Sequence, residues 1–444
     1  MRKAKLLPLY FEERNKREET EFNQQLLILK KIYTDVADFL DPIPIGKNNV
    51  SADAIVFPQL IGAAFHHSDS IKKYNLPAIV LTSKFGTVEM WDWEIVTYLR
   101  EKGLNIYSPY EISLAKVIIR SITAKKTLNK GAKFLMFQDS PGEGMQAYIF
   151  KRFFWWEDEC TKRLKESFGI GLIYKSYKEL NIRAENILDK RAEEELLNWD
   201  YEFDENLTKD AKLLAVKLYL AVKDTIKEVG NIEGVGANCL NESFNSKTTP
   251  CLAWNRVFEK DDIIFACEGD TLTMISTFIL YRSLIQPVMM TNLYPFLVGM
   301  AALAHEKIDK FPEIDRPSDH ALGVHCGYFG FAPKSFCKRW ICRPKVLEIV
   351  NKKAHVIDCE FELGKITLAK IYPDLKRFSV IEGEIEKYVQ YPDSDCRNGA
   401  LIRWKNGYDI MEHLCSHHSL IIKGHQLPAL KQIAKTFDFD LILP

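Results

Sequence analysis

The chain lacks several features that mark common classes of protein. It carries no net charge, because 60 lysines and arginines balance 60 aspartates and glutamates, so no overall field attracts nucleic acid or an anionic membrane. A polar residue or a proline interrupts every apolar stretch before about 18 positions, so no transmembrane helix is expected. The basic start has no apolar run long enough for a signal peptide. These absences predict a cytoplasmic protein with neither nucleic-acid nor membrane partners.

Signatures of several enzyme classes are also missing. There is no Gly-x-Ser-x-Gly elbow and no dinucleotide fingerprint, which argues against hydrolases and dehydrogenases. The turn-rich segment 138–146 lacks the Gly-Lys-Ser/Thr ending of a phosphate-binding loop. His325-Cys326, Cys337 and Cys342 are too unevenly spaced for a paired zinc motif, which leaves structural zinc a weak alternative. In a long chain of intracellular type, the ten cysteines are expected to be reduced.

Strands and helices alternate in the first two thirds of the chain. An amphipathic pattern over 9–40 predicts a helix, and short apolar runs at 54–58, 78–82 and 132–137 predict strands separated by helices. We place these elements in an N-terminal α/β domain, residues 1–165.

A second set of strands and helices fills residues 166–288, which we expect to form a central α/β domain that carries Glu268. The last third, 289–444, has closely spaced strands broken by Gly, Pro and Asp-Ser clusters, which indicates an antiparallel sheet or barrel. A helix over 428–437 and a strand over 439–443 close the chain. The predicted fold is therefore α/β, with two Rossmann-like domains built on parallel sheets and a C-terminal antiparallel β-barrel-like domain.

The segment Glu268-Gly269-Asp270 is the most informative in the chain. It directly follows the apolar run 263–267, and buried carboxylates must be paired, hydrogen-bonded or bound to metal. Ligands of open α/β sheets gather at the carboxyl ends of strands. A site at Glu268 is therefore expected.

Histidines are concentrated in the predicted C-terminal domain. Seven of the ten follow residue 319, and His417-His418 immediately precedes an apolar strand. A strand-end carboxylate and a strand-start histidine from two domains can meet in a cleft, and oxygen with imidazole suits Mn²⁺, Fe²⁺, Co²⁺ or Zn²⁺. For a single histidine, a structural role is the alternative.

These motifs together resemble a known superfamily. In order and spacing, 267–270, 324–327, 416–418 and 424–425 resemble the L-fucose and L-arabinose isomerases, especially the fucose-isomerase-like branch. The resemblance extends to Asp139-Ser140-Pro141-Gly142 and to the aromatic run at 153–156, so it covers most of the chain. It implies that a divalent cation, usually Mn²⁺, holds a sugar while a carboxylate moves a proton between C1 and C2 through a cis-enediol.

The resemblance also implies roles for particular residues. Glu268 corresponds to a glutamate that ligates metal and acts in acid/base chemistry, His418 to the C-terminal histidine ligand, and His325 to a histidine at or beside the metal. The sequence departs from the family at Asn292, where a second carboxylate is expected. An asparagine oxygen can ligate a hard cation but has no proton to exchange.

Three explanations for this departure stay open. Glu242 could enter the site from the preceding loop as the proton carrier, although it could instead cap a helix that opens near Ser243. Asp270 could turn inward if the strand has already ended. Alternatively, the chemistry differs: the protein acts on another sugar, catalyses an epimerisation, or is a carbohydrate-binding or regulatory homologue that does not turn its ligand over.

Further side chains are candidates for substrate contact. Arg397 could reach an anionic group at the far end of a substrate, or pair with an aspartate in its own hairpin. Trp156 belongs to the aromatic run, which could otherwise form core or a subunit contact. Gln146 ends the loop 138–146, which could be a plain connection, and His425 belongs to the resembling C-terminal motif. The family also implies a homotrimer or homohexamer with the site at a subunit junction.

Overall fold

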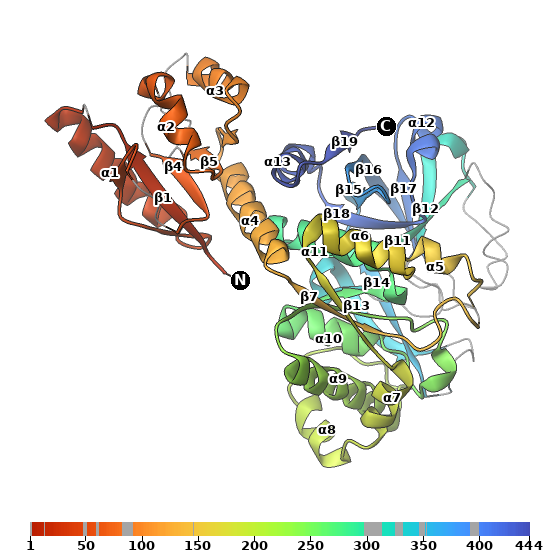
Figure 1. The fold of residues 1–444 in the computed structure, drawn as a ribbon. Coiled ribbons are helices and arrows are strands. Elements are labelled where there is room, and N and C mark those ends of the chain that lie inside the picture. The colour runs from red at the N-terminus through yellow and green to blue at the C-terminus, as the bar shows by residue number, and fades with distance from the viewer. Residues whose placement is uncertain are drawn as a thin grey trace. The chain divides into compact units, whose positions relative to one another are not determined.

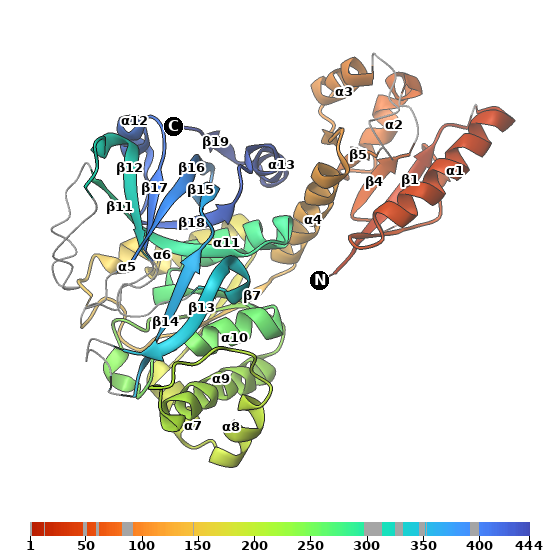
Figure 2. The ribbon, with the colours of Figure 1, turned by 180° about the vertical axis from the view of Figure 1, so that it is seen from behind.

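The computed structural model of the chain describes residues 2–12, 14–47, 51–58, 62–81, 92–144, 146–296, 313–324, 332–345, 351, 353–390 and 399–444 (Figures 1 and 2). The chain divides into two compact units. One consists of Met1–Thr127, Arg282–Leu284 and Pro428–Asp438, and the other of Leu128–Tyr281, Ile285–Leu427 and Phe439–Pro444. No helix among the described residues is both long and apolar enough to cross a membrane.

The first unit contains a parallel sheet with the strand order β2-β1-β4-β5-β6, and β3 also pairs with β1. Its strands are β1 (Ala4–Tyr10), β2 (Ala37–Phe39), β3 (Ile43–Pro44), β4 (Ala54–Phe57), β5 (Ala78–Val80) and β6 (Ile106–Tyr107). Its helical elements are α1 (Lys16–Ile32), η1 (Gly62–His67), α2 (Ser68–Lys72), α3 (Asp92–Glu101), most of α4 (Ile112–Asn129) and most of α13 (Leu427–Phe437).

Alternation along β1 explains why this sheet has two covered faces. Successive strand side chains point to opposite faces. Leu7 and Leu9 belong to one buried apolar cluster, whereas Ala4 and Leu6 belong to another. An apolar layer on both faces is typical of a parallel sheet covered by helices.

The helix predicted over 9–40 is shorter than expected. α1 starts only after Asn15, whose side chain accepts from the backbone N–H groups of Arg17 and Glu18 in a capping box, and Phe22 and Leu26 are among its buried residues. Strand β1 precedes it and β2 follows it. The predicted helix was therefore too long at both ends. Residues 9–10 and 37–39 are not helical but pair in the sheet as parts of β1 and β2.

The second unit contains another parallel sheet, with the order β10-β9-β7-β8. Its strands are β7 (Lys133–Phe137), β8 (Gly171–Lys175), β9 (Ile232–Ala237) and β10 (Ile264–Ala266). The helical elements between and after them are α5 (Phe150–Phe153), α6 (Asp158–Phe168), α7 (Tyr177–Glu185), α8 (Asp189–Leu196), α9 (Lys209–Val229), η2 (Ser243–Asn245), α10 (Cys251–Asp261), η3 (Cys267–Gly269) and most of α11 (Thr271–Leu284).

Helices pack on both faces of this second sheet. Phe134 and Phe137 of β7 point to opposite faces, since they are three residues apart. Phe134 meets Phe278 of α11 edge-on at 5.7 Å between ring centroids, and Phe137 stacks with Trp254 of α10 at 6.5 Å.

The prediction for 132–137 was right about the strand but wrong about its sheet. β7 pairs with β8 on one side and β9 on the other, so it is an interior strand of the second sheet. The boundary between the two parallel sheets therefore lies before β7, earlier than residue 165. Alternation of strands and helices continues through this point, so the pattern alone did not mark the change.

The C-terminal strands form the predicted antiparallel barrel. Six strands follow each other in the order β15-β18-β11-β12-β17-β16, and pairing of β15 with β16 closes the ring. They are β11 (Val288–Pro295), β12 (His320–Val324), β15 (Gly364–Ile371), β16 (Arg377–Val389), β17 (Gly399–Arg403) and β18 (His418–Lys423). The fold class predicted from the sequence is thus confirmed.

The remaining elements lie outside the closed ring. β13 and β14 pair only with each other among the described strands, whereas β19 extends the barrel sheet by pairing in parallel with β16. They are β13 (Cys337–Pro344), β14 (His355–Phe361), β19 (Asp440–Ile442), η6 (Pro317–Asp319), η7 (Lys334–Phe336) and α12 (Gly407–His413).

Candidate functional site

The second parallel sheet brings three loops to one edge. The loops after β7, β9 and β10 begin at Gln138, Asn238 and Cys267, and all leave the carboxyl ends of parallel strands. That is the edge where open α/β sheets bind their ligands.

The loop after β10 turns sharply at Glu268-Gly269. Both residues have positive φ, 56° and 69°, and Glu268 is buried, with 4% of its surface exposed. This backbone is unfavourable for a glutamate and persists only where neighbours hold it. The indole N–H of Trp156 donates to the Gly269 carbonyl at 2.8 Å, and the Thr271 N–H donates to the Phe154 carbonyl at 3.1 Å. Trp156 is therefore used in holding the turn that carries Glu268.

Asp270 follows the turn as the N-cap of α11. Its carboxylate accepts from the Thr273 N–H at 2.9 Å, the Thr273 hydroxyl at 2.6 Å and the Lys370 ammonium at 3.1 Å. Burial alone would raise the pKa of Asp270, but Lys370, His418 and Thr273 outweigh it and hold that pKa well below its usual range. Asp270 is therefore an ionised carboxylate whose oxygens are already used.

His418 binds this carboxylate through one ring nitrogen. Nδ1 lies 2.8 Å from Oδ2 of Asp270, and because an ionised carboxylate only accepts, Nδ1 carries the proton. The ring stacks on Phe154 with 4.7 Å between centroids and 14° between planes. Both contacts fix the ring's orientation, as in the carboxylate–histidine pairs that position metal ligands.

The other nitrogen of His418 faces Glu268. Nε2 is buried and has no hydrogen-bond partner among the described residues, and Oε1 of Glu268 lies 4.0 Å from it. That separation is too long for a hydrogen bond. The structure therefore brings the strand-end acid and the C-terminal histidine together with a small gap between them.

Two amide side chains lie beside Glu268 and His418. Gln146 donates from Nε2 to Oε2 of Glu268 at 3.4 Å, and Asn292 of β11 pairs with His418 of β18 in the barrel. The amide oxygens of Gln146 and Asn292 are buried, and neither has a partner among the residues that the structure describes. Buried polar atoms are rarely left without partners, so these oxygens indicate a ligand.

Lys370 of β15 is part of the cluster and was missed in the sequence. Its side chain is 4% exposed and also donates to the Ser416 hydroxyl at 3.0 Å. A lysine within an alternating apolar strand was the available signal, because a buried lysine requires a partner. The sequence did not say that the partner would be Asp270, 100 positions away.

Side chains of the loop after β9 form hydrogen bonds with the loop after β7. Asn241 donates to the carbonyls of Ser140 and Glu143 and accepts from the Gln146 N–H at 3.0 Å. Gly144, at φ 136°, has room for no side chain, since a Cβ would lie 2.9 Å from Oδ1 of Asn241. These contacts hold Gln146 where it meets Glu268.

Glu242, in the loop after β9, also forms hydrogen bonds with the loop after β7. Its carboxylate accepts from the N–H groups of Asp139 at 2.8 Å and Ser140 at 3.0 Å, and from the Asn238 amide at 3.2 Å. Burial raises the pKa of Glu242 to about 7, although the Asp139 and Ser140 N–H groups act in the opposite direction. A short 3₁₀ helix does open at Ser243, but the Glu242 side chain makes no capping hydrogen bond to it.

The structure does not bring His425 to this cluster. His425 lies seven residues after His418, beyond the far end of β18, and the strand itself spans about 17 Å. Its Nε2 donates to the Gly383 carbonyl at 3.1 Å, and its Nδ1 lies 3.7 Å from Glu382. His325 and Arg397 lie outside the described residues.

The donor set fits a divalent cation. No group of three or more His, Cys, Asp or Glu side chains suited to hold a metal occurs within the described ranges. However, Glu268 and His418 offer one oxygen and one nitrogen, and Gln146 and Asn292 offer amide oxygens that hard cations accept. Two ligands about 2.1 Å from one ion lie about 3.0 Å apart at a right angle and about 4.2 Å apart when opposite. The 4.0 Å between Glu268 and His418 falls within this range.

Comparison with models of protein families found no match, and comparison with curated proteins found none. The resemblance to the isomerase superfamily therefore depends on the motifs themselves.

Proposed function

We propose that the protein is a metal-dependent aldose–ketose isomerase acting on a pentose or a (deoxy)hexose through a cis-enediol. The observation that carries this proposal is the buried pair of Glu268 and His418. Their facing atoms are 4.0 Å apart, and Nε2 of His418 has no partner among the described residues. Nδ1 is engaged with Asp270, so Nε2 is the ring nitrogen that faces the Glu268 carboxylate. In the proposal, a divalent cation is held between these two atoms.

Each neighbour has a role in the proposal. Mn²⁺ or another divalent cation would supply positive charge that stabilises the enediolate of the sugar. Glu268 and His418 would hold it, with Asn292 and Gln146 contributing amide oxygens. Gln146 would also orient Glu268, and Asp270 would keep the His418 ring in place.

Glu268 and Glu242 are the proposed proton-exchanging groups. A pKa near 7 suits an acid/base group, and burial raises the pKa of Glu242 to about that value. Asp270 is poorly suited to the task, because its low pKa keeps it ionised.

One observation favours a second candidate function. Asn292 occupies the strand next to His418 and offers no exchangeable proton where the family has a carboxylate. A carbohydrate-binding or regulatory homologue could keep the cation and the sugar without turning the sugar over.

Hydrogen exchange separates the two candidates. Purified protein is incubated with Mn²⁺ and a panel of pentoses, hexoses and 6-deoxyhexoses in D₂O, and deuterium at C2 and ketose formation are followed by NMR. An isomerase incorporates deuterium and forms ketose, and His418→Gln abolishes both. His413→Gln is the matched control, because the His413 side chain bonds only within α12 among the described contacts. Sugar binding with no exchange in any divalent metal would support the binding homologue.

Assembly is part of the proposal. We propose a cytoplasmic homotrimer or homohexamer with the site at a subunit junction. Three apolar side chains at α5, close in sequence to Phe154, support a contact surface: Tyr148 is 69% exposed, Ile149 53% and Phe153 48%. Sedimentation analysis should give a trimer or hexamer that Phe153→Asp dissociates, and a monomeric wild type would refute this part.

A further inference from the structure

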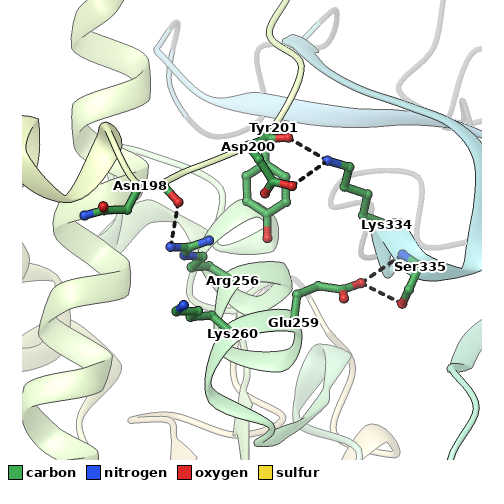
Figure 3. Close-up of a pocket in the computed structure, with 8 residues that line it drawn as sticks. All are labelled: Asn198, Asp200, Tyr201, Arg256, Glu259, Lys260, Lys334 and Ser335. Atoms are coloured by element: carbon green, nitrogen blue, oxygen red, sulfur yellow. Dashed lines mark hydrogen bonds and ion pairs between the residues drawn. The ribbon is translucent and has the colours of Figure 1, made fainter.

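A pocket opens in the same unit as the candidate site. It has a volume of about 570 Å³, within the range of small-molecule sites (Figure 3). Its lining comes from the loop after α8, from α10 and from η7, whereas the Glu268 cluster lies at the carboxyl ends of the strands. None of the pocket residues belongs to the proposed isomerase site, so the inference below does not depend on that proposal.

Two buried donors in this pocket have no hydrogen-bond partner among the described residues. Nε of Arg256 and the hydroxyl of Tyr201 are both buried and make no hydrogen bond with any described residue. Arg256 is 6% exposed and Tyr201 8% exposed. Figure 3 shows the Tyr201 hydroxyl directed toward the Arg256 and Glu259 side chains. Leaving such donors unsatisfied is costly, so they indicate a bound acceptor.

The surroundings hold these donors rigidly without satisfying them. Nη2 of Arg256 donates to the Asn198 carbonyl at 3.0 Å, and the guanidinium lies over the Trp199 ring at 5.5 Å. The Tyr201 ring packs against Trp340 at 4.8 Å between centroids. Burial raises the pKa of Tyr201, so its hydroxyl stays a donor at neutral pH.

The charged groups of the pocket are largely paired with one another or with neighbours. Lys334 is paired with Asp200 at 3.2 Å, and Glu259 accepts from the N–H and hydroxyl of Ser335 at 3.0 and 2.8 Å. The two carboxylates of the lining are therefore already engaged (Figure 3). Nη2 of Arg256 also pairs with Glu195 at 3.4 Å, so Nε is the part of this guanidinium left for a ligand, and the exposed Lys260 adds positive charge at the same pocket.

We infer that this pocket binds a small organic anion through a phosphate or carboxylate group that accepts from Arg256 Nε and from the Tyr201 hydroxyl. Lys260 contributes charge from the rim. A pocket of this size accommodates a metabolite larger than the anionic group alone.

Calorimetric titration of the full-length protein tests the inference. Inorganic phosphate and acetate are the two probes, which distinguish a phosphate site from a carboxylate site, and glycerol is the neutral control. We expect saturable binding of at least one anion and none of glycerol. Tyr201→Phe should weaken binding at least 10-fold, since it removes one of two buried donors, and Lys260→Gln about threefold.

Matched variants control for general effects. Tyr177→Phe removes another buried tyrosine hydroxyl outside the pocket lining, and Lys227→Gln removes a lysine from the last turn of a different helix, α9. Both should bind the anion as the wild type does. Circular dichroism should show Tyr201→Phe folded, because the Tyr201 hydroxyl makes no hydrogen bond to any described residue that the change would remove. Absence of binding by both anions, or equal affinity in wild type and Tyr201→Phe, would overturn the inference.

Discussion

Replacing Lys370 with methionine tests how the histidine of the site is held. Methionine keeps the length and apolar stem of lysine but removes the charge, so Asp270 loses its nearest cation. The two side chains are 4% and 0% exposed, and the ammonium lies 3.1 Å from the carboxylate. Removing one partner of a buried ion pair typically costs about 3 to 5 kcal/mol. Because His418 and Thr273 still bind Asp270, we expect about 3 kcal/mol at neutral pH.

The pH dependence of this loss has a definite sign. The pKa of Asp270 is lowered in the folded protein, so its stabilising contribution is present above about pH 3.9, the ordinary pKa of an aspartate in an unfolded chain. The contribution is lost as pH falls toward the lowered pKa. The difference between wild type and Lys370→Met should therefore shrink by roughly 1.4 kcal/mol for each pH unit below that value.

Urea unfolding followed by tryptophan fluorescence measures both effects. Lys423→Met is the matched control, because Lys423 pairs with Glu362 at 3.4 Å while 35% and 62% of the two side chains are exposed. An exposed pair of this kind contributes less than about 1 kcal/mol. Combining Lys370→Met with Asp270→Asn, which keeps a good N-cap, should cost less than the sum of the single changes. The reasoning is refuted if Lys370→Met costs no more than Lys423→Met.

Three further predictions concern the cation and the loop. Asp270→Asn should lower Mn²⁺ affinity about 10- to 100-fold in calorimetry, because Asp270 orients the His418 ring but is not itself a proposed ligand. Unchanged affinity would exclude this positioning role. Asn292→Asp should tighten Mn²⁺ binding by adding a charged oxygen ligand, and weaker or equal binding would remove Asn292 from the site. Asn241→Ala should remove the hydrogen bonds that hold the loop after β7, so amide hydrogen exchange at 139–146 should become faster, with little change elsewhere. Unaltered exchange would show that other contacts hold this loop.

The architecture could be predicted because each element carries a local pattern. Apolar strands separated by helices predict parallel sheets, and short strands with Gly and Pro turns predict a barrel. Which strands share a sheet is decided by pairing between distant segments. β7 could not be assigned for that reason, and strand β1 was obscured because the helical periodicity of α1 was extended into it.

The site shows the same division between local and distant information. Glu268 attracted attention because a carboxylate after a buried strand is costly, and His418 because it precedes an apolar strand. Lys370 and the stacking of Phe154 on His418 depend on barrel closure and on the aromatic run folding over the turn, which no local pattern encodes. Glu242 was noticed for its polar loop, but its hydrogen bonds to the neighbouring loop came only from the structure.

The most direct test is a crystal structure of the protein with Mn²⁺, recorded at the manganese absorption edge. We predict one anomalous peak about 2.0 to 2.2 Å from both Oε1 of Glu268 and Nε2 of His418. Full occupancy of Mn²⁺ elsewhere, or no peak at millimolar Mn²⁺ with water between these two atoms, would contradict the account.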